Sequence, residues 1–142
     1  MKRFGSAAWS GNLRDGSGSV STESGALDDF IFTFFSRYGD KPGTNPEELI
    51  GAAHAACFTM SFVRMLGTVN LAPEHLDAKS VVEIEKDGEG FSITSVHLSV
   101  SARIPEADEA TFQAIAHKAK AFCPVSKLMN TEIGFEATLL PK

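Results

Sequence analysis

A long apolar segment that follows a cluster of helix-start signals constrains the fold of this chain most. Residues 44–48 (Thr-Asn-Pro-Glu-Glu) supply cap residues, a proline for the first helical position and two carboxylates for the first turn. Thr44 and Glu47 also have the spacing of a capping box. From there to Gly67, a natural stop, apolar residues occur almost all around the helix. The pattern predicts one long helix that is buried on several sides.

Strand patterns flank this helix on both sides. Short strands are predicted at residues 7–11, 18–23 and 31–36, followed by a loop at 37–43. Beyond the helix, the pattern predicts strands at 77–85 and 91–104 with a hairpin at 86–90, helices at 105–121 and 125–129, and a closing strand at 132–140. Since strands and helices are segregated, the predicted class is α+β, in a single domain over residues 1–142.

Charge and motif content exclude several classes of protein. The net charge is −5, which argues against a nucleic-acid binder. There is no metal-ligand spacing, Walker A motif or dinucleotide-binding glycine pattern. His54 and Arg64 interrupt the most apolar stretch, so no membrane span is expected, and no apolar run follows the basic N-terminus as in a signal peptide. We therefore expect a cytoplasmic protein whose thiols stay reduced.

The only two cysteines, Cys57 and Cys123, are the candidates for chemistry. Cys57 lies in the middle of the long helix, where no helix dipole stabilises a thiolate, so its activation requires a neighbouring cation. Cys123 precedes Pro124, which favours Cys123 as the N-cap of a helical turn whose free amides would stabilise a thiolate. Taken alone, Cys57 is better explained as a buried apolar residue, and Cys123 is explained equally well as a buried thiol at a helix junction. Together they allow a cycle in which a sulfenic acid condenses with the second thiol to a disulfide.

Arg37 is the candidate cation. Its guanidinium keeps its charge and can hold a thiolate and a peroxide oxygen together. Glu47, in the first turn of the long helix, would hold Arg37 through a carboxylate–guanidinium fork. His54 lies three residues before Cys57 on the same side of the helix, so a Cys–His ion pair stays open beside the commoner role of a core histidine.

Two stretches of this sequence closely resemble the cysteine motifs of the OsmC/Ohr peroxidases, the osmotically inducible and organic hydroperoxide resistance proteins. Residues 43–58 (GTNPEELIGAAHAACF) resemble their active-site helix, and residues 119–126 (AKAFCPVS) resemble their second cysteine motif. Residues 9–11 and 20–25 also fit. The presence of His54 and the position of Arg37 bring the chain closer to the OsmC branch.

The resemblance implies an OsmC-like fold, with antiparallel sheets around a long buried central helix in an intertwined homodimer. It implies reduction of organic hydroperoxides, and less efficiently of hydrogen peroxide. By motif match Cys57 would be peroxidatic, Cys123 resolving and Arg37 the activating cation, oriented by Glu47 or by its neighbour Glu48. No cofactor is implied, and the reductant would be an external dithiol or a lipoyl group.

Two other functions stay open from the residues alone. A non-catalytic protein on the same fold could bind a small molecule in a cavity lined by Phe58, Met60 and the aromatic segment. A Cys–His acyl hydrolase built on His54 would lack a convincing third group to orient the histidine. For the peroxidase, the run Phe30–Phe35 predicts a preference for bulky apolar hydroperoxides if its rings line the pocket.

Overall fold

The computed structural model describes residues 1–142, which pack as two compact units, residues 1–49 and 50–142. Each unit is described by itself. The assignment of the whole chain to one domain stays a prediction.

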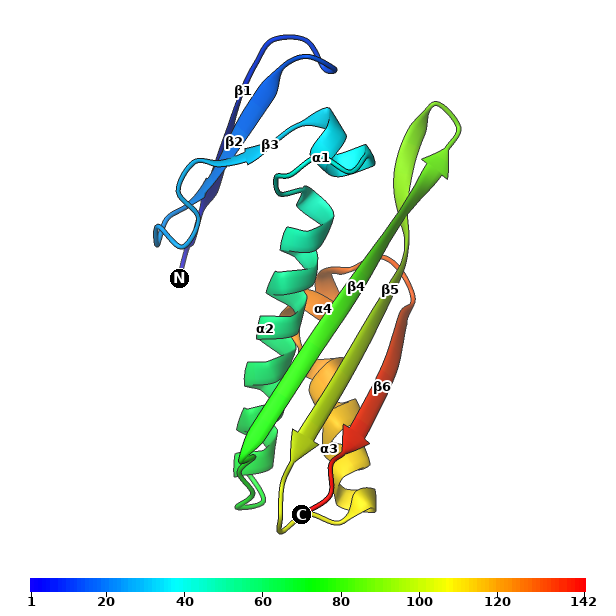
Figure 1. The fold of residues 1–142 in the computed structure, drawn as a ribbon. Coiled ribbons are helices and arrows are strands. Elements are labelled where there is room, and N and C mark those ends of the chain that lie inside the picture. The colour runs from blue at the N-terminus through cyan, green and yellow to red at the C-terminus, as the bar shows by residue number, and fades with distance from the viewer. The chain divides into compact units, whose positions relative to one another are not determined.

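The first unit holds a three-stranded antiparallel sheet in the order β1 (Gly5–Ser10), β2 (Ser17–Thr22), β3 (Phe30–Phe32) (Figure 1). The ring centroids of Trp9 and Phe32 lie 5.5 Å apart across this sheet. Gly18 pairs with Phe32 in the register, and a Cβ on Gly18 would lie 2.6 Å from the Phe32 ring. A glycine is therefore required where the aromatic ring crosses β2.

The aromatic segment does not continue as a strand, so the prediction of a strand over residues 31–36 is wrong in its second half. A short helix, α1 (Phe34–Tyr38), begins directly after β3. Thr33 and Ser36 form a capping box in which the Thr33 hydroxyl accepts from the Ser36 amide at 3.0 Å and the Ser36 hydroxyl accepts from the Thr33 amide at 2.8 Å. These local bonds outweigh the strand propensity of the phenylalanines. Arg37 consequently lies on a helix.

The long helix α2 (Pro46–Gly67) forms as predicted, but its N-terminus is capped differently. The Asn45 side chain accepts from the Glu48 amide at 2.9 Å, and the Thr44 hydroxyl donates to the Glu48 carboxylate at 2.6 Å. The predicted capping box between Thr44 and Glu47 is therefore wrong. Because Glu48 takes part in the capping, the Glu47 carboxylate is free to make another interaction.

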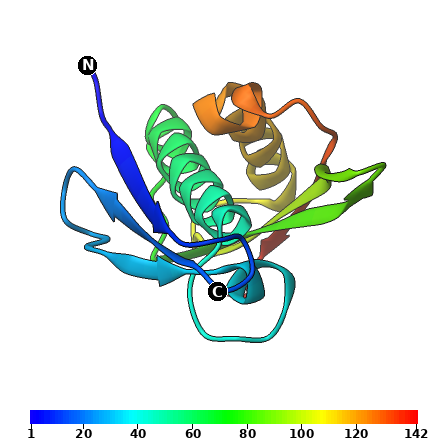
Figure 2. The same ribbon diagram turned by 90° about the horizontal axis from the view of Figure 1, so that it is seen from above.

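The second unit contains a three-stranded sheet in the order β4 (His75–Asp87), β5 (Gly90–Arg103), β6 (Ile133–Leu139). The β4–β5 hairpin is antiparallel, but β5 and β6 are parallel, so the expectation of purely antiparallel sheets is wrong. Parallel pairing needs a crossover, and α3 (Glu109–Phe122) with α4 (Pro124–Leu128) supplies it. In Figure 2, α2 and α3 lie side by side over one face of this sheet.

One face of α2 packs into the core of the second unit. Phe58, Phe62 and Leu66 recur every fourth residue and are completely buried, together with Phe112 of α3 and Leu98 of β5. The opposite side is open in the single chain, where Met60 is 76% exposed and Val63 43%. The helix is thus buried on one side rather than on several. By length and composition alone α2 could also cross a membrane, contrary to expectation, although core helices of soluble proteins meet the same criterion.

Candidate functional site

The two cysteines meet in the second unit, where α2 passes the junction between α3 and α4. Both are free thiols; Cys57 on α2 is half-buried and Cys123 is completely buried. Their side chains lie close enough to interact directly, and each influences the protonation of the other. The structure therefore places a half-exposed thiol beside a buried one, which the sequence separation could not reveal.

Cys123 is the N-cap of α4, as predicted, with Pro124 at the first helical position. Burial raises the pKa of Cys123, but the Ser126 hydroxyl, the amides of Ser126 and Val125, and the Cys57 thiol outweigh burial and lower the pKa overall. The Cys123 side chain makes no capping hydrogen bond to the amides of α4, so these amides act on the sulfur as oriented dipoles. A negative charge on Cys123 is favoured.

Cys57 has the opposite balance. Burial raises its pKa, the Val125 amide lowers it, and the neighbouring Cys123 raises it again, so that the net pKa lies above the ordinary value. The opposite directions of the two pKa shifts favour a negative charge on Cys123 over one on Cys57. A nucleophilic Cys57 thiolate therefore requires an additional positive charge, as the mid-helix position predicts.

His54 is completely buried on α2 and does not serve Cys57. Its Nδ1 lies 2.8 Å from the Ser80 hydroxyl and its Nε2 lies 2.8 Å from the Ser126 hydroxyl. Burial, followed by the charge of Lys120, lowers the pKa of His54 and keeps the imidazole neutral. Both ring nitrogens are engaged by serines, so the Cys57–His54 ion pair is wrong and the acyl hydrolase loses its base.

Arg37 and Glu47 form an ion pair within the first unit. The Arg37 Nη2 lies 2.7 Å from Glu47 Oε1, and Nε lies 3.2 and 3.3 Å from the two carboxylate oxygens. The guanidinium carbon also lies 5.1 Å from the centroid of the Tyr38 ring. Glu47 is almost buried, whereas about a third of the Arg37 side chain, 34%, stays exposed. The hydrogen bond that Arg37 donates to Glu47 raises the pKa of Arg37, so the guanidinium keeps its charge in a fixed orientation.

The structure thus brings the four predicted site residues together as two pairs. Arg37 and Glu47 pair in the first unit, while Cys57 and Cys123 pair in the second. Glu48 bonds to Thr44, so Glu47 is the carboxylate that Arg37 contacts. No group of three or more histidine, cysteine or acidic side chains is arranged to hold a metal ion.

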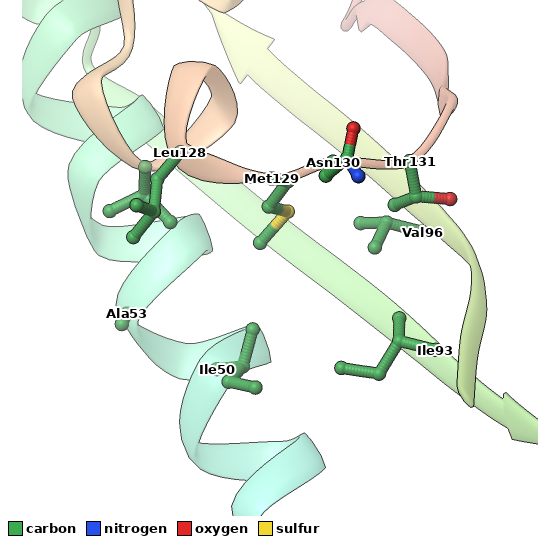
Figure 3. A pocket seen from close by; sticks show the side chains of 9 residues that line it. Ile50, Ala53, Ile93, Val96, Leu128, Met129, Asn130 and Thr131 are labelled. Carbon is green, nitrogen blue, oxygen red and sulfur yellow. The ribbon is translucent and has the colours of Figure 1, made fainter. Parts of the chain in front are cut away.

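An apolar pocket of about 420 Å³ opens in the second unit. Figure 3 shows side chains from α2, β5, α4 and the segment after α4 around it, with Asn130 and Thr131 as its polar members. The lining is Ile50, Ala53, Ile93, Val96, Val125, Leu128, Met129, Asn130 and Thr131. Val125, whose amide acts on both sulfurs, connects the pocket to the thiols.

The sequence did not reveal which residues line this pocket. Phe58, expected in the lining, is in the core, and Met60 points to solvent at 76% exposure. The sequence after Cys123 did indicate part of the site. The residues in the first turn of α4 are those whose amides and hydroxyl act on the Cys123 thiol. Ser126 and Val125 could have been identified from that position.

Comparisons with known proteins identify the family of this chain. Residues 39–138 match the family model described as OsmC-like protein. The chain is 44% identical to peroxiredoxin OsmC of Escherichia coli over 98% of its length and 97% of the relative, and 32% identical to organic hydroperoxide resistance protein OhrB of Bacillus subtilis over 86% and 88%.

The same fold occurs in a solved structure of an organic hydroperoxide resistance protein OsmC from Legionella pneumophila. That structure has a TM-score of 0.72 and 23% identity, with 98% of each chain covered. Both the family model and the relative from E. coli cover well over half of the chain. The chain therefore belongs to the OsmC-like family.

Proposed function

We propose that this protein is a thiol-dependent peroxidase that reduces organic hydroperoxides, and hydrogen peroxide less efficiently. The relatives at 44% and 32% identity are, by name, a peroxiredoxin and an organic hydroperoxide resistance protein, which supports this activity. The observation that carries the mechanism is the direct contact between a half-exposed Cys57 and a buried Cys123. A peroxidatic and a resolving thiol need this asymmetry, because only the first must reach the peroxide.

In the proposed cycle the Cys57 thiolate attacks the outer oxygen of ROOH. The O–O bond breaks, the RO⁻ leaving group takes a proton to become ROH, and Cys57 becomes a sulfenic acid. The Cys123 sulfur then attacks Cys57, a disulfide forms, and the hydroxyl leaves with a proton as water. An external dithiol in the cytoplasm, such as a lipoyl group, then reduces the disulfide, and no bound cofactor takes part.

Arg37 supplies the positive charge that Cys57 lacks in this proposal. Burial and Cys123 raise the pKa of Cys57, so the nucleophile needs a cation at the sulfur. Arg37 is suited to this role because Glu47 fixes one edge of its guanidinium while about a third of the side chain, 34%, stays exposed. We infer that Arg37 joins the thiols in the assembled protein and that Glu47 orients it.

The organic part of the substrate would occupy the apolar pocket. Ile50 and Ala53 lie on the same face of α2 as Cys57, at spacings of seven and four residues, and Val125 connects the pocket lining to the sulfur. An alkyl or aryl group placed there would gain from apolar burial that hydrogen peroxide cannot obtain. Within the second unit the lining is mostly aliphatic, and the contribution of the run Phe30–Phe35 to the preference for bulky apolar hydroperoxides stays a prediction.

The pocket would equally suit a protein that binds a small molecule without reacting with it, and turnover separates the two functions. With cumene hydroperoxide and a lipoyl dithiol, Cys57→Ser is expected to abolish peroxide consumption. Cys123→Ser is expected to consume one equivalent and then stall at the sulfenic acid. Full steady-state activity in Cys57→Ser would contradict the peroxidase mechanism, and slow, ordinary thiol reactivity in the parent would favour the binding protein.

We also propose the intertwined homodimer that the family resemblance implies. Its support is the open apolar side of α2, with Met60 at 76% and Val63 at 43% exposure, because a single soluble chain rarely leaves such a helix face uncovered. Light scattering is expected to give twice the chain mass for the parent and the single mass for Met60→Lys. A monomeric parent would contradict the dimer without affecting the thiol chemistry.

A further inference from the structure

A line of polar side chains runs through the second unit from the sheet to the buried cysteine. The Ser80 hydroxyl on β4 lies 2.8 Å from His54 Nδ1, and His54 Nε2 lies 2.8 Å from the Ser126 hydroxyl. The Ser126 hydroxyl in turn acts on the Cys123 sulfur. His54 and Cys123 are completely buried, whereas Ser80 and Ser126 are half-buried. Water can therefore reach either serine, but not the histidine or the cysteine.

With a neutral imidazole, the hydrogen bonds along this line can be donated in either of two opposite directions. In one, Ser80 donates to Nδ1, Nε2–H donates to Ser126, and the Ser126 hydroxyl donates to a Cys123 thiolate. In the other, the Cys123 thiol donates to Ser126, Ser126 donates to Nε2, and Nδ1–H donates to Ser80. Reversing the direction carries one proton from water at Ser80 to Cys123, or back, without ever charging the imidazole, because the Ser80 hydroxyl regains from water the proton that it passes to Nδ1.

The charged surroundings keep the imidazole in this neutral role. Lys120 on α3, whose ammonium donates to the Ile133 carbonyl at 2.8 Å, disfavours an imidazolium at His54, and burial disfavours it further. Cys57 on α2 is the other titratable group that acts on Cys123. A core histidine needs only two hydrogen-bond partners, but here one of those partners also contacts a redox thiol. The contact gives the line a chemical consequence.

We propose that Ser80, His54 and Ser126 position and stabilise Cys123 as the sulfur that leaves when a dithiol opens the Cys57–Cys123 disulfide. This role rests on the proposed peroxidase cycle, in which that disulfide forms. Ser126 and His54 act as positioning residues, since neither reacts itself. Thiol–disulfide exchange is faster when the leaving sulfur is a stable thiolate.

The step balances as a two-electron reduction by a dithiol. One reductant thiolate attacks the Cys57 sulfur, which is the accessible member of the pair. A mixed disulfide forms with Cys57, the Cys57–Cys123 bond breaks, and the electron pair goes to Cys123. The second reductant thiol then displaces Cys57 and closes the reductant's own disulfide, and the two protons of the dithiol end on the protein sulfurs. The polar line delivers the proton that Cys123 takes up.

The test uses the disulfide made with diamide, so that it does not require peroxidase activity. In the reduced Cys57→Ala background, Ser126→Ala is expected to raise the pKa of Cys123 by about one unit, read from thiolate ultraviolet absorbance against pH. In the protein with both cysteines, Ser126→Ala is expected to slow reduction by dithiothreitol about threefold, because exchange rates carry about half of a thiol pKa change. His54→Leu is expected to give the same shift, and the double variant no larger one.

Two matched variants separate this role from simple packing. Ser61→Ala removes a hydroxyl from α2, the helix of His54, where it donates to the Ala119 carbonyl at 3.2 Å, and is expected to leave the Cys123 titration unchanged. Ser126→Thr keeps the hydroxyl and is expected to restore the parent pKa. An unchanged titration in Ser126→Ala, or an equal shift in Ser61→Ala, would overturn this inference alone. A parent that consumes no peroxide would overturn the proposed function alone.

Discussion

The charge of Arg37 gives the sharpest prediction about the peroxidatic cysteine. Burial and Cys123 hold the pKa of Cys57 above its ordinary value, so without a cation most of Cys57 is a protonated thiol at neutral pH. A guanidinium–thiolate contact contributes about 1.5–3 kcal/mol, and the lower end applies because 34% of the Arg37 side chain is exposed to solvent. Arg37→Met is therefore expected to slow Cys57 oxidation about tenfold at pH 7.

The pH dependence of this loss of rate follows from the direction in which Arg37 shifts the pKa of Cys57. In the proposed site the Arg37 charge lowers the pKa of Cys57 in the parent, whereas in Arg37→Met only the raising effects of burial and Cys123 remain. The difference between them should be greatest between the two pKa values and should shrink as the pH rises past the higher one. Stopped-flow oxidation by cumene hydroperoxide under single-turnover conditions measures this profile in both proteins.

Arg14→Met is the matched control for this experiment. Arg14 belongs to the same unit, and its guanidinium carbon lies 5.2 Å from the centroid of the Phe34 ring. The substitution removes the same charge and should change the rate less than twofold. A rate for Arg37→Met within twofold of the parent at pH 7, or a loss that does not shrink with rising pH, would refute the role given to Arg37.

Three further predictions concern the carboxylate, the pocket and the core. Glu47→Gln breaks the fork that includes the 2.7 Å bond from Arg37 and should lower the single-turnover rate several-fold. Glu48→Gln should lower only the stability of the helix, and equal losses of rate in the two variants would contradict the assignment of Glu47 as the partner of Arg37. Ile93→Asn in the pocket should raise the KM for cumene hydroperoxide but not the KM for hydrogen peroxide. Val81→Asn, at an exposed site on β4, should change neither KM, and a parallel rise for both substrates in Ile93→Asn would contradict a pocket for the organic group. Phe62→Ala should lower the free energy of unfolding by about 3–5 kcal/mol in urea denaturation, because Phe62 is completely buried between Phe58 and Phe112; a loss below 1 kcal/mol would contradict that packing.

The sequence predicted the elements that depend on local signals. The proline and carboxylates at the start of α2, and Pro124 after Cys123, are short-range features, and both helices begin where these residues indicate. The α1 helix was missed because two hydrogen bonds between Thr33 and Ser36 override a run of strand-forming aromatic residues. The choice of Asn45 over Thr44 as the acceptor for the Glu48 amide likewise depends on backbone geometry that spacing does not determine.

The features that depend on tertiary contact were beyond the sequence. The parallel pairing of β5 with β6 is set by the crossover through α3, and alternation alone has no direction. Helical spacing suggested Cys57 as a partner of His54. The structure shows two serines instead, from β4 and α4, which lie far from His54 along the chain. The contact between Cys57 and Cys123 depends on the same packing of α2 against the α3–α4 junction.

The state of the two sulfurs after one turnover tests the central claim most directly. The reduced protein is treated with one equivalent of cumene hydroperoxide and quenched with an alkylating agent, and its intact mass and peptides are measured. The two-cysteine peroxidase predicts the loss of two hydrogens, no alkylation, and a peptide that joins Cys57 to Cys123. Two alkylated cysteines with the peroxide unconsumed, or a stable oxygen adduct on Cys57 beside an alkylated Cys123, would contradict it.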